Sequence, residues 1–201
     1  MVRSNPLSKP PASTEATEDA AMRSLIGQAI PFLAKENGLP RLVSWSDASL
    51  AQLDFNFEGS WNTNNNKVQF TGDVKFPNGE TTLEADFPSF LGGEGRAPSA
   101  LTYCFYGAMS CYGSTFATQA AMAGVEIEKM KINLTLGVDF RSALGVGQFP
   151  PMKGFNFEVF VKSNATDEDI QKIKKLTDER CPAIWAMQNP VPFTTSATKD
   201  I

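Results

Sequence analysis

The chain has 201 residues, of which 42% are hydrophobic and 20% charged, and its formal net charge is −4. This length suits one globular domain with some residues left for a tail. An acidic balance without a basic block argues against a nucleic-acid partner. There is no histidine, so the commonest metal ligand and general base are missing, and three cysteines alone do not complete a four-ligand zinc site. We therefore expect no metal and no cofactor.

The N-terminal region differs in composition from the rest of the chain. Residues 1–15 are rich in Pro, Ser and Lys, and we expect them to be disordered. Apolar residues then recur at helical spacing, which predicts a helix from Thr17 to Asn37 with a kink at Pro31. The sequence Gly-Leu-Pro at 38–40 is typical of a helix end.

These features divide the chain in two. We predict an extension over residues 1–40, which packs on the main domain or on a partner chain, and a domain over residues 41–201. The N-terminus lacks the apolar core of a secretory signal. We therefore expect a cytoplasmic protein whose cysteines are reduced by default.

Alternating apolar residues predict three short strands. They are LDFNFEG at 53–59, KVQFTGDVKF at 67–76 and TTLEADF at 81–87. The short polar links between them favour an antiparallel meander. The following segment, PSFLGGEGRAP at 88–98, contains two prolines and three glycines among other loop-forming residues, and we expect a loop.

No charged side chain occurs from Ala97 to Val125. Serine, threonine and glutamine residues make this segment too polar to span a membrane, so we expect no membrane partner. A helix without charge on any face is usually buried all round. We predict a central helix from Pro98 to about Ala123, packed by other elements or by its copy in a dimer.

The remainder of the chain predicts a hairpin, a helix and a last strand. The long strands are VEIEKMKINLTLGVDF at 125–140 and GFNFEVFVKS at 154–163. A capping sequence at Thr166 and the Cys-Pro pair after Arg180 bound a second helix. A short turn at 183–190 and a strand at 191–198 follow. The order strands, helix, strands, helix, strand indicates an α+β fold.

The three cysteines do not have equivalent positions. Cys104 and Cys111 are seven residues apart on the predicted helix, or about 10 Å along its axis, which exceeds the reach of a disulfide. An intramolecular partner of Cys111 must therefore be Cys181, which continues the apolar stripe of the second helix. Buried free cysteine is also a common small hydrophobic residue, so spacing alone leaves both interpretations open.

Three stretches resemble the OsmC/Ohr family of osmotically inducible and organic hydroperoxide resistance proteins. They are GGEGRAPSALTYCFYGAMSC ending at Cys111, AAMAGVEIEKMKI after it, and ERCPAIWAM around Cys181. The resemblance covers roughly residues 50–198. It implies an OsmC-like α+β fold, in which antiparallel sheets wrap around central helices in an intertwined homodimer.

The resemblance also implies a thiol-dependent, peroxiredoxin-like activity. Cys111 would attack a small organic hydroperoxide, and Cys181 would resolve the resulting sulfenic acid as a disulfide. A dithiol reductant would then restore the enzyme by thiol exchange. Cys104 matches neither cysteine of the active pair and is interpreted as a core residue.

The sequence departs from the active family pattern at two places. Active members carry a glutamate ten residues before the first cysteine, where this chain has Leu101. They also carry an arginine in the early strands, where the nearest cation by spacing is Lys67. Arg96, oriented by Glu94, could replace the missing arginine only from a second subunit, because four helical turns separate residues 96 and 111.

The sequence alone leaves two other functions open. One is a catalytically degenerate OsmC-like dimer that binds a small hydrophobic ligand in a pocket lined by Phe105, Tyr112 and Trp185. The other is a chain without chemistry of its own, whose residues 1–40 dock a partner.

Overall fold

The computed structural model describes residues 30–36, 39–45, 53–64 and 66–199. The chain forms two compact units, Met1–Asp54 and Phe55–Ile201. In the second unit, antiparallel strands and helices form a mixed α+β fold, as the sequence predicts.

The first unit contains a β-hairpin where the sequence pattern predicted the end of a helix. Strand β1 (Ile30–Glu36) pairs antiparallel with β2 (Leu39–Trp45), and Glu36 lies opposite Leu39. The predicted helix is therefore wrong over residues 30–36. Proline disfavours a helix interior, and the two residues between the strands are Asn-Gly, the sequence most favoured between paired strands. The predictions for residues 1–15 and 17–29 lie outside the described residues.

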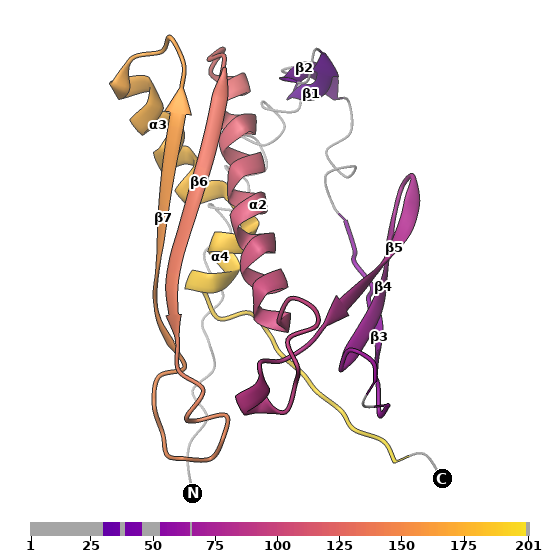
Figure 1. Ribbon diagram of the computed structural model, residues 1–201. Coiled ribbons are helices and arrows are strands. Elements are labelled where there is room, and N and C mark those ends of the chain that lie inside the picture. Colours follow the sequence, from indigo (N-terminus) through magenta and orange to yellow (C-terminus); the bar gives the residue numbers. More distant parts are fainter. Residues whose placement is uncertain (1–29, 37–38, 46–52, 65, 200–201) are drawn as a thin grey trace, which may run out of the picture. The chain divides into compact units, whose positions relative to one another are not determined.

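The second unit begins with the predicted meander. Strands β3 (Glu58–Trp61), β4 (Phe70–Phe76) and β5 (Gly79–Ala85) form an antiparallel sheet in that order (Figure 1). The first strand is shorter than predicted, because pairing with β4 begins only at Glu58. Phe55 and Phe57, which precede it, stack on each other with ring centroids 6.3 Å apart.

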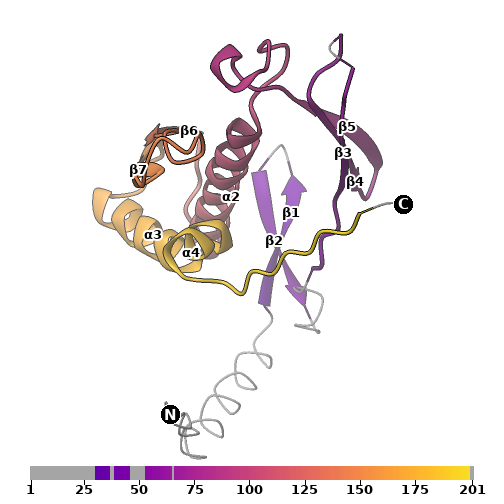
Figure 2. The ribbon, with the colours of Figure 1, turned by 90° about the horizontal axis from the view of Figure 1, so that it is seen from below.

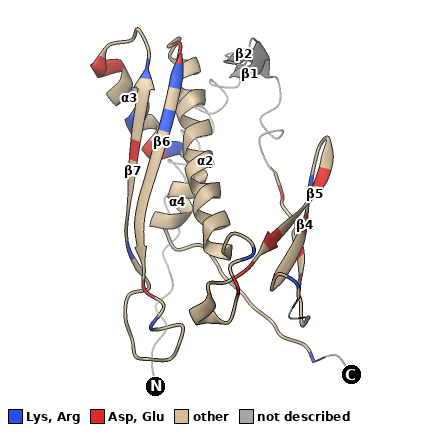
Figure 3. Cartoon of the chain, viewed as in Figure 1, with Lys and Arg blue, Asp and Glu red and all other residues tan. Residues whose placement is uncertain are grey.

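The central helix is α2 (Ala100–Met122), close to its predicted bounds. The side chain of Ser99 caps its N-terminus by accepting a hydrogen bond from the amide of Thr102. Figure 3 shows the whole helix without charge. Only one of its faces is buried within this chain, however, and the residues left exposed include Cys104, Gly107 and Ser114.

A long hairpin and two further helices pack around α2. Strands β6 (Lys129–Val138) and β7 (Met152–Lys162) are antiparallel, and α3 (Asp167–Arg180) follows, capped by Thr166. These elements surround the buried side of α2 (Figure 2). The core of the unit lies between them and is formed by the side chains Tyr112, Phe116, Ala120, Ile173, Cys181 and Ile184.

The C-terminal segment differs from the prediction in two respects. Residues predicted as a turn at 183–190 largely belong to a short helix, α4 (Pro182–Gln188). Proline at the first helical position favours this start. Residues 191–198 do not form the predicted strand, because none of the described strands pairs with them. Among the described helices, none combines the length and the apolar character that a membrane span requires.

Candidate redox site

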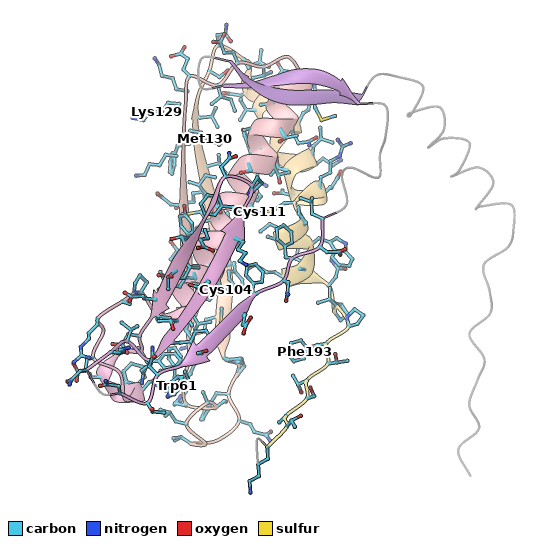
Figure 4. The ribbon with its side chains drawn as sticks, turned by 90° about the vertical axis from the view of Figure 1, so that its right-hand side faces the viewer. Trp61, Cys104, Cys111, Lys129, Met130 and Phe193 are labelled. Atoms are coloured by element: carbon cyan, nitrogen blue, oxygen red, sulfur yellow. The ribbon has the colours of Figure 1, made fainter. Side chains whose placement is uncertain are left out.

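Cys111 and Cys181 lie side by side in the core. Their Sγ atoms are 3.7 Å apart, and the thiol of Cys181 donates to the sulfur of Cys111. Cys181 is completely buried, whereas Cys111 is half-buried in the middle of α2. Both are free thiols. Figure 4 shows Cys104 on α2 as well, seven residues before Cys111. Cys104 is exposed in this chain and therefore is not the core residue that we expected.

The position of Cys181 is fixed by the two helices that meet at this residue. Its amide donates to the carbonyl of Thr177 at 3.0 Å and closes α3, while its own carbonyl accepts from the amide of Trp185 at 2.9 Å and opens α4. The backbone of Cys181 is extended, with φ −71° and ψ 115°. The following proline favours this conformation, because its ring disfavours a helical residue before it.

The surroundings of Cys111 keep its sulfur protonated. Burial, the largest effect, raises the pKa of the Cys111 thiol above its ordinary value, and the neighbouring thiol of Cys181 raises it further. A hydrogen bond from the amide of Ala183 at the start of α4 and one from the side chain of Thr115 act in the opposite direction. Since the net shift is upward, Cys111 by itself is a weak nucleophile at neutral pH.

Two polar contacts join α2 to the end of α3 near this pair. The hydroxyl of Tyr112 donates to Oδ1 of Asp178 at 2.6 Å, and Lys174 contacts the other oxygen of Asp178 at 2.6 Å. The guanidinium of Arg180 donates to Oε1 of Gln119 at 2.8 Å. Arg180 therefore binds a side chain on α2 and not, as its position at a helix end suggests, the free carbonyls of its own helix.

Sequence reasoning missed both of these contacts. The available signal was the seven-residue spacing of Tyr112 and Gln119, which places two polar side chains on one side of a helix that must bury that side. Burial and the nearby carboxylate of Asp178 together raise the pKa of Tyr112, so its hydroxyl remains a hydrogen-bond donor.

The glycine-rich loop before α2 holds the predicted supporting residues. Glu94 and Arg96 form an ion pair, and the guanidinium of Arg96 also donates to the carbonyl of Lys67 at 3.4 Å. Cys111 lies eleven residues beyond Ala100, where α2 begins, or about 16 Å along the helix axis. Arg96 precedes the start of α2, so within one chain it is separated from the thiols by at least this length of helix.

A buried carboxylate that sequence reasoning missed organises this loop. Oδ2 of Asp86 accepts hydrogen bonds from the amides of Glu94 at 3.1 Å and of Arg96 at 2.9 Å. The amide of Arg96 makes the largest contribution to lowering the pKa of Asp86. The loop thus depends on an ionised Asp86, although nothing in its sequence context resembles a standard capping motif.

The three residues predicted to line a ligand pocket have different environments. Tyr112 lines a pocket of about 300 Å³. Phe105 packs edge-on against Phe155, with ring centroids 5.8 Å apart, and Phe155 lines the same pocket. Trp185 lies on α4 with half of its surface exposed. The other residues that line the pocket are Phe157, Lys174, Asp178, Ile184, Met187 and Gln188.

Comparison with known proteins assigns the fold and the family. Residues 93–196 match the family model of the OsmC-like proteins, and the chain belongs to this family. A search of the curated proteins found no match.

Solved structures resemble the chain at low sequence identity. One is an OsmC-like protein from Mycoplasma pneumoniae, with 18% identity and a TM-score of 0.51, over 68% of this chain and 88% of that protein. Another, from Psychrobacter arcticus 273-4, is proposed to be an osmotic stress induced and detoxification response protein. It has 12% identity and a TM-score of 0.51, over 67% of this chain and 89% of that one. These likenesses confirm the OsmC-like fold.

Proposed function

We propose that this OsmC-like protein is a thiol-dependent redox protein that reduces small organic hydroperoxides through Cys111 and Cys181. The observation that carries the proposal is the 3.7 Å separation of their Sγ atoms. Two cysteines seventy residues apart in sequence meet in the core, and the one with access to solvent is the one that must meet the peroxide. Membership of the OsmC-like family supports the same chemistry.

The reaction proceeds in three balanced steps. The thiolate of Cys111 attacks the terminal oxygen of the hydroperoxide, the O–O bond breaks, and the leaving alkoxide takes up a proton to become an alcohol. The thiol of Cys181 then attacks the sulfur of the Cys111 sulfenic acid, which forms the disulfide and releases water. An external dithiol reduces the disulfide by exchange, restoring both thiols and leaving as its own disulfide.

The proposal includes a homodimer, because the pKa of Cys111 is raised within a single chain. A second subunit would place its own Arg96, held by Glu94, near the thiol and favour the thiolate. The chain supplies a surface for this association in the exposed, charge-free side of α2. We place the protein in the cytoplasm, where both cysteines are kept reduced between turnovers.

The proposal is tested by mass spectrometry after one equivalent of cumene hydroperoxide. We expect a disulfide between Cys111 and Cys181 in the wild type and a sulfenic acid trapped at Cys111 in Cys181→Ser. Cys111→Ser should consume no peroxide, and Cys104→Ser is the matched control that behaves as wild type. Unmodified thiols in a folded protein would sink the proposal.

The raised pKa of Cys111 also favours a second candidate, a degenerate dimer that binds a small hydrophobic ligand. The pocket beside Tyr112 has aromatic walls and a volume of about 300 Å³. If this function is correct, a fluorescent probe of apolar sites such as 1-anilinonaphthalene-8-sulfonate binds to the wild type, and replacing Phe157 by Ser weakens that binding. Peroxide should then leave both thiols unchanged.

A further inference from the structure

We propose that the contacts Tyr112–Asp178 and Gln119–Arg180 form a two-point clamp that positions Cys181 for attack on oxidised Cys111. The four side chains are positioning residues, since none of them is hydrogen-bonded to either of the two sulfur atoms in the part of the chain that the structure describes. The inference rests on the proposed function of the cysteine pair. It adds that these two contacts determine how fast the disulfide forms.

The arrangement of the contacts on both helices supports the clamp. Tyr112 directly follows Cys111 on α2, and Gln119 lies seven residues further, about 10 Å along the same side. On α3, Asp178 and Arg180 lie three residues and one residue before Cys181. The last turn of α3 is therefore attached to α2 at two points, and this turn carries Cys181.

Burial makes both contacts costly to break. Tyr112 is 3% exposed and Gln119 is 6% exposed, so their polar atoms have little access to water if the contact opens. A buried polar group that loses its partner keeps the full desolvation penalty, and hydrogen bonds with a charged partner are the stronger ones. Lys174 binds the second carboxylate oxygen of Asp178, Oδ2, and so holds Oδ1 in place as the acceptor for Tyr112.

The clamp matters because disulfide formation needs a small and directed movement. The sulfur atoms must approach from 3.7 Å to a bonding distance of about 2.05 Å. Holding two reacting groups near this geometry makes the step effectively unimolecular and raises the local concentration of one thiol at the other. Without the clamp, the last turn of α3 samples wider separations, and the same chemistry becomes slower.

The chemical step affected is the second one only. The sulfur of Cys181 displaces hydroxide from the sulfur of the Cys111 sulfenic acid; the hydroxide combines with the Cys181 proton, so one S–S bond forms, one S–O bond breaks and one water leaves. The first step, attack of Cys111 on the peroxide, requires no movement of α3. The two rates therefore separate a positioning role from a general loss of structure.

The test compares Tyr112→Phe, Gln119→Leu and the double variant with wild type. Stopped-flow measurements with cumene hydroperoxide give the rate of sulfenic acid formation and the rate of disulfide closure. We expect each single change to slow closure by about tenfold, the effect of one lost hydrogen bond, and the double variant to lose more. Sulfenic acid formation in Gln119→Leu, which lies outside the pocket, should stay within about twofold of wild type.

Three variants serve as controls. Asp178→Asn keeps an oxygen acceptor for Tyr112 but loses the charge and the contact with Lys174, so its closure rate should lie between those of wild type and Tyr112→Phe. Lys172→Gln removes an exposed ion pair on the same helix, to Glu168, and should change neither rate. Arg180→Met removes the contact with Gln119 by changing the exposed partner. It therefore tests the same contact if Gln119→Leu does not fold.

A second measurement separates this inference from the proposed function. The equilibrium of the cysteine pair with reduced and oxidised glutathione reports the effective concentration of one thiol at the other without any peroxide. The clamp predicts that the clamp variants lower this concentration by the same factor as the closure rate. Folded variants with an unchanged closure rate and an unchanged glutathione equilibrium would overturn the clamp. If the wild type does not react with peroxide but the variants still shift the glutathione equilibrium, only the proposed function is overturned.

Discussion

The backbone of Gly93 crosses directly over the carbonyl group of Phe87. A Cβ atom at residue 93 would lie 1.8 Å from the carbonyl oxygen of Phe87. The same carbonyl accepts a hydrogen bond from the amide of Gly95 at 3.1 Å. This crossing closes the glycine-rich loop that leads into α2, and it leaves no space for a side chain.

We therefore predict that Gly93→Ala destabilises the protein. The clash is with backbone atoms, which cannot rotate away as a side chain can, and overpacking of this kind costs about 1–3 kcal/mol. Urea unfolding measures the change in the free energy of unfolding. Gly107→Ala is the control, because within one chain no atom outside its own helix lies within 4 Å of the new methyl group, and alanine favours a helix. A Gly93→Ala variant as stable as wild type would contradict the crossing.

Asp86 makes the stability of the same loop dependent on pH. Its pKa is lowered in the folded state, first by the amide of Arg96, so its contribution is present at neutral pH and is lost as the pH falls through the lowered value. We expect Asp86→Asn to be less stable than wild type at pH 7. The difference in the free energy of unfolding between Asp86→Asn and wild type should shrink below pH 3.8, the ordinary pKa of an aspartate. Unfolding curves at both pH values check this, and a constant difference would argue against it.

The protonation of Cys111 predicts a pH-dependent rate of sulfenic acid formation. Because burial raises its pKa, the thiolate is a minor species at neutral pH, and its fraction increases about tenfold for each unit of pH below the pKa. In the monomer, prepared by dilution so that no second Arg96 is near the thiol, we expect the rate with cumene hydroperoxide to rise about tenfold from pH 6.5 to pH 7.5. Cys111→Ser provides the background. A rate that stays flat over this range in the monomer would contradict the raised pKa of Cys111.

The exposed side of α2 allows a direct test of the proposed homodimer. Ser114 lies on this charge-free side, and a lysine there would be solvated in a free chain but unpaired in an interface. We expect Ser114→Lys to dissociate the dimer while the far-UV circular dichroism is retained. Light scattering after gel filtration measures the mass. Gln171→Lys, exposed on α3, is the matched control, and an unchanged dimer in Ser114→Lys would exclude this surface.

Much of the fold and the central pair of the site followed from the sequence. Period-two patterns located β4, β5 and the β6–β7 hairpin, helical spacing located α3, and the charge-free run from Ala97 to Val125 located α2. These are local signals with strong physical causes. Helical spacing left the approach of Cys181 to Cys111 as one of two open interpretations, and the resemblance to the OsmC/Ohr family implied it.

The remaining features depend on information that local patterns do not contain. The Asn37-Gly38 sequence signalled a hairpin, yet the apolar spacing before it matched a helix equally well, and pairing with β2 decided the outcome. The segment at 191–198 alternates as a strand does but has no partner among the described strands. The hydrogen bond Arg180–Gln119 joins residues 61 positions apart. The spacing of Tyr112 and Gln119 indicates that both lie on the buried side of α2, but it does not identify their partners.

The junction at Cys181 gives the protein an intrinsic optical reporter. The carbonyl of Cys181 is hydrogen-bonded to the amide of Trp185, a residue that is 51% exposed. A change in the backbone at the sulfur is thereby transmitted to a fluorophore within one helical turn. The emission of Trp185, isolated by replacing the other two tryptophans with phenylalanine, should follow each thiol–disulfide cycle in real time without an added dye.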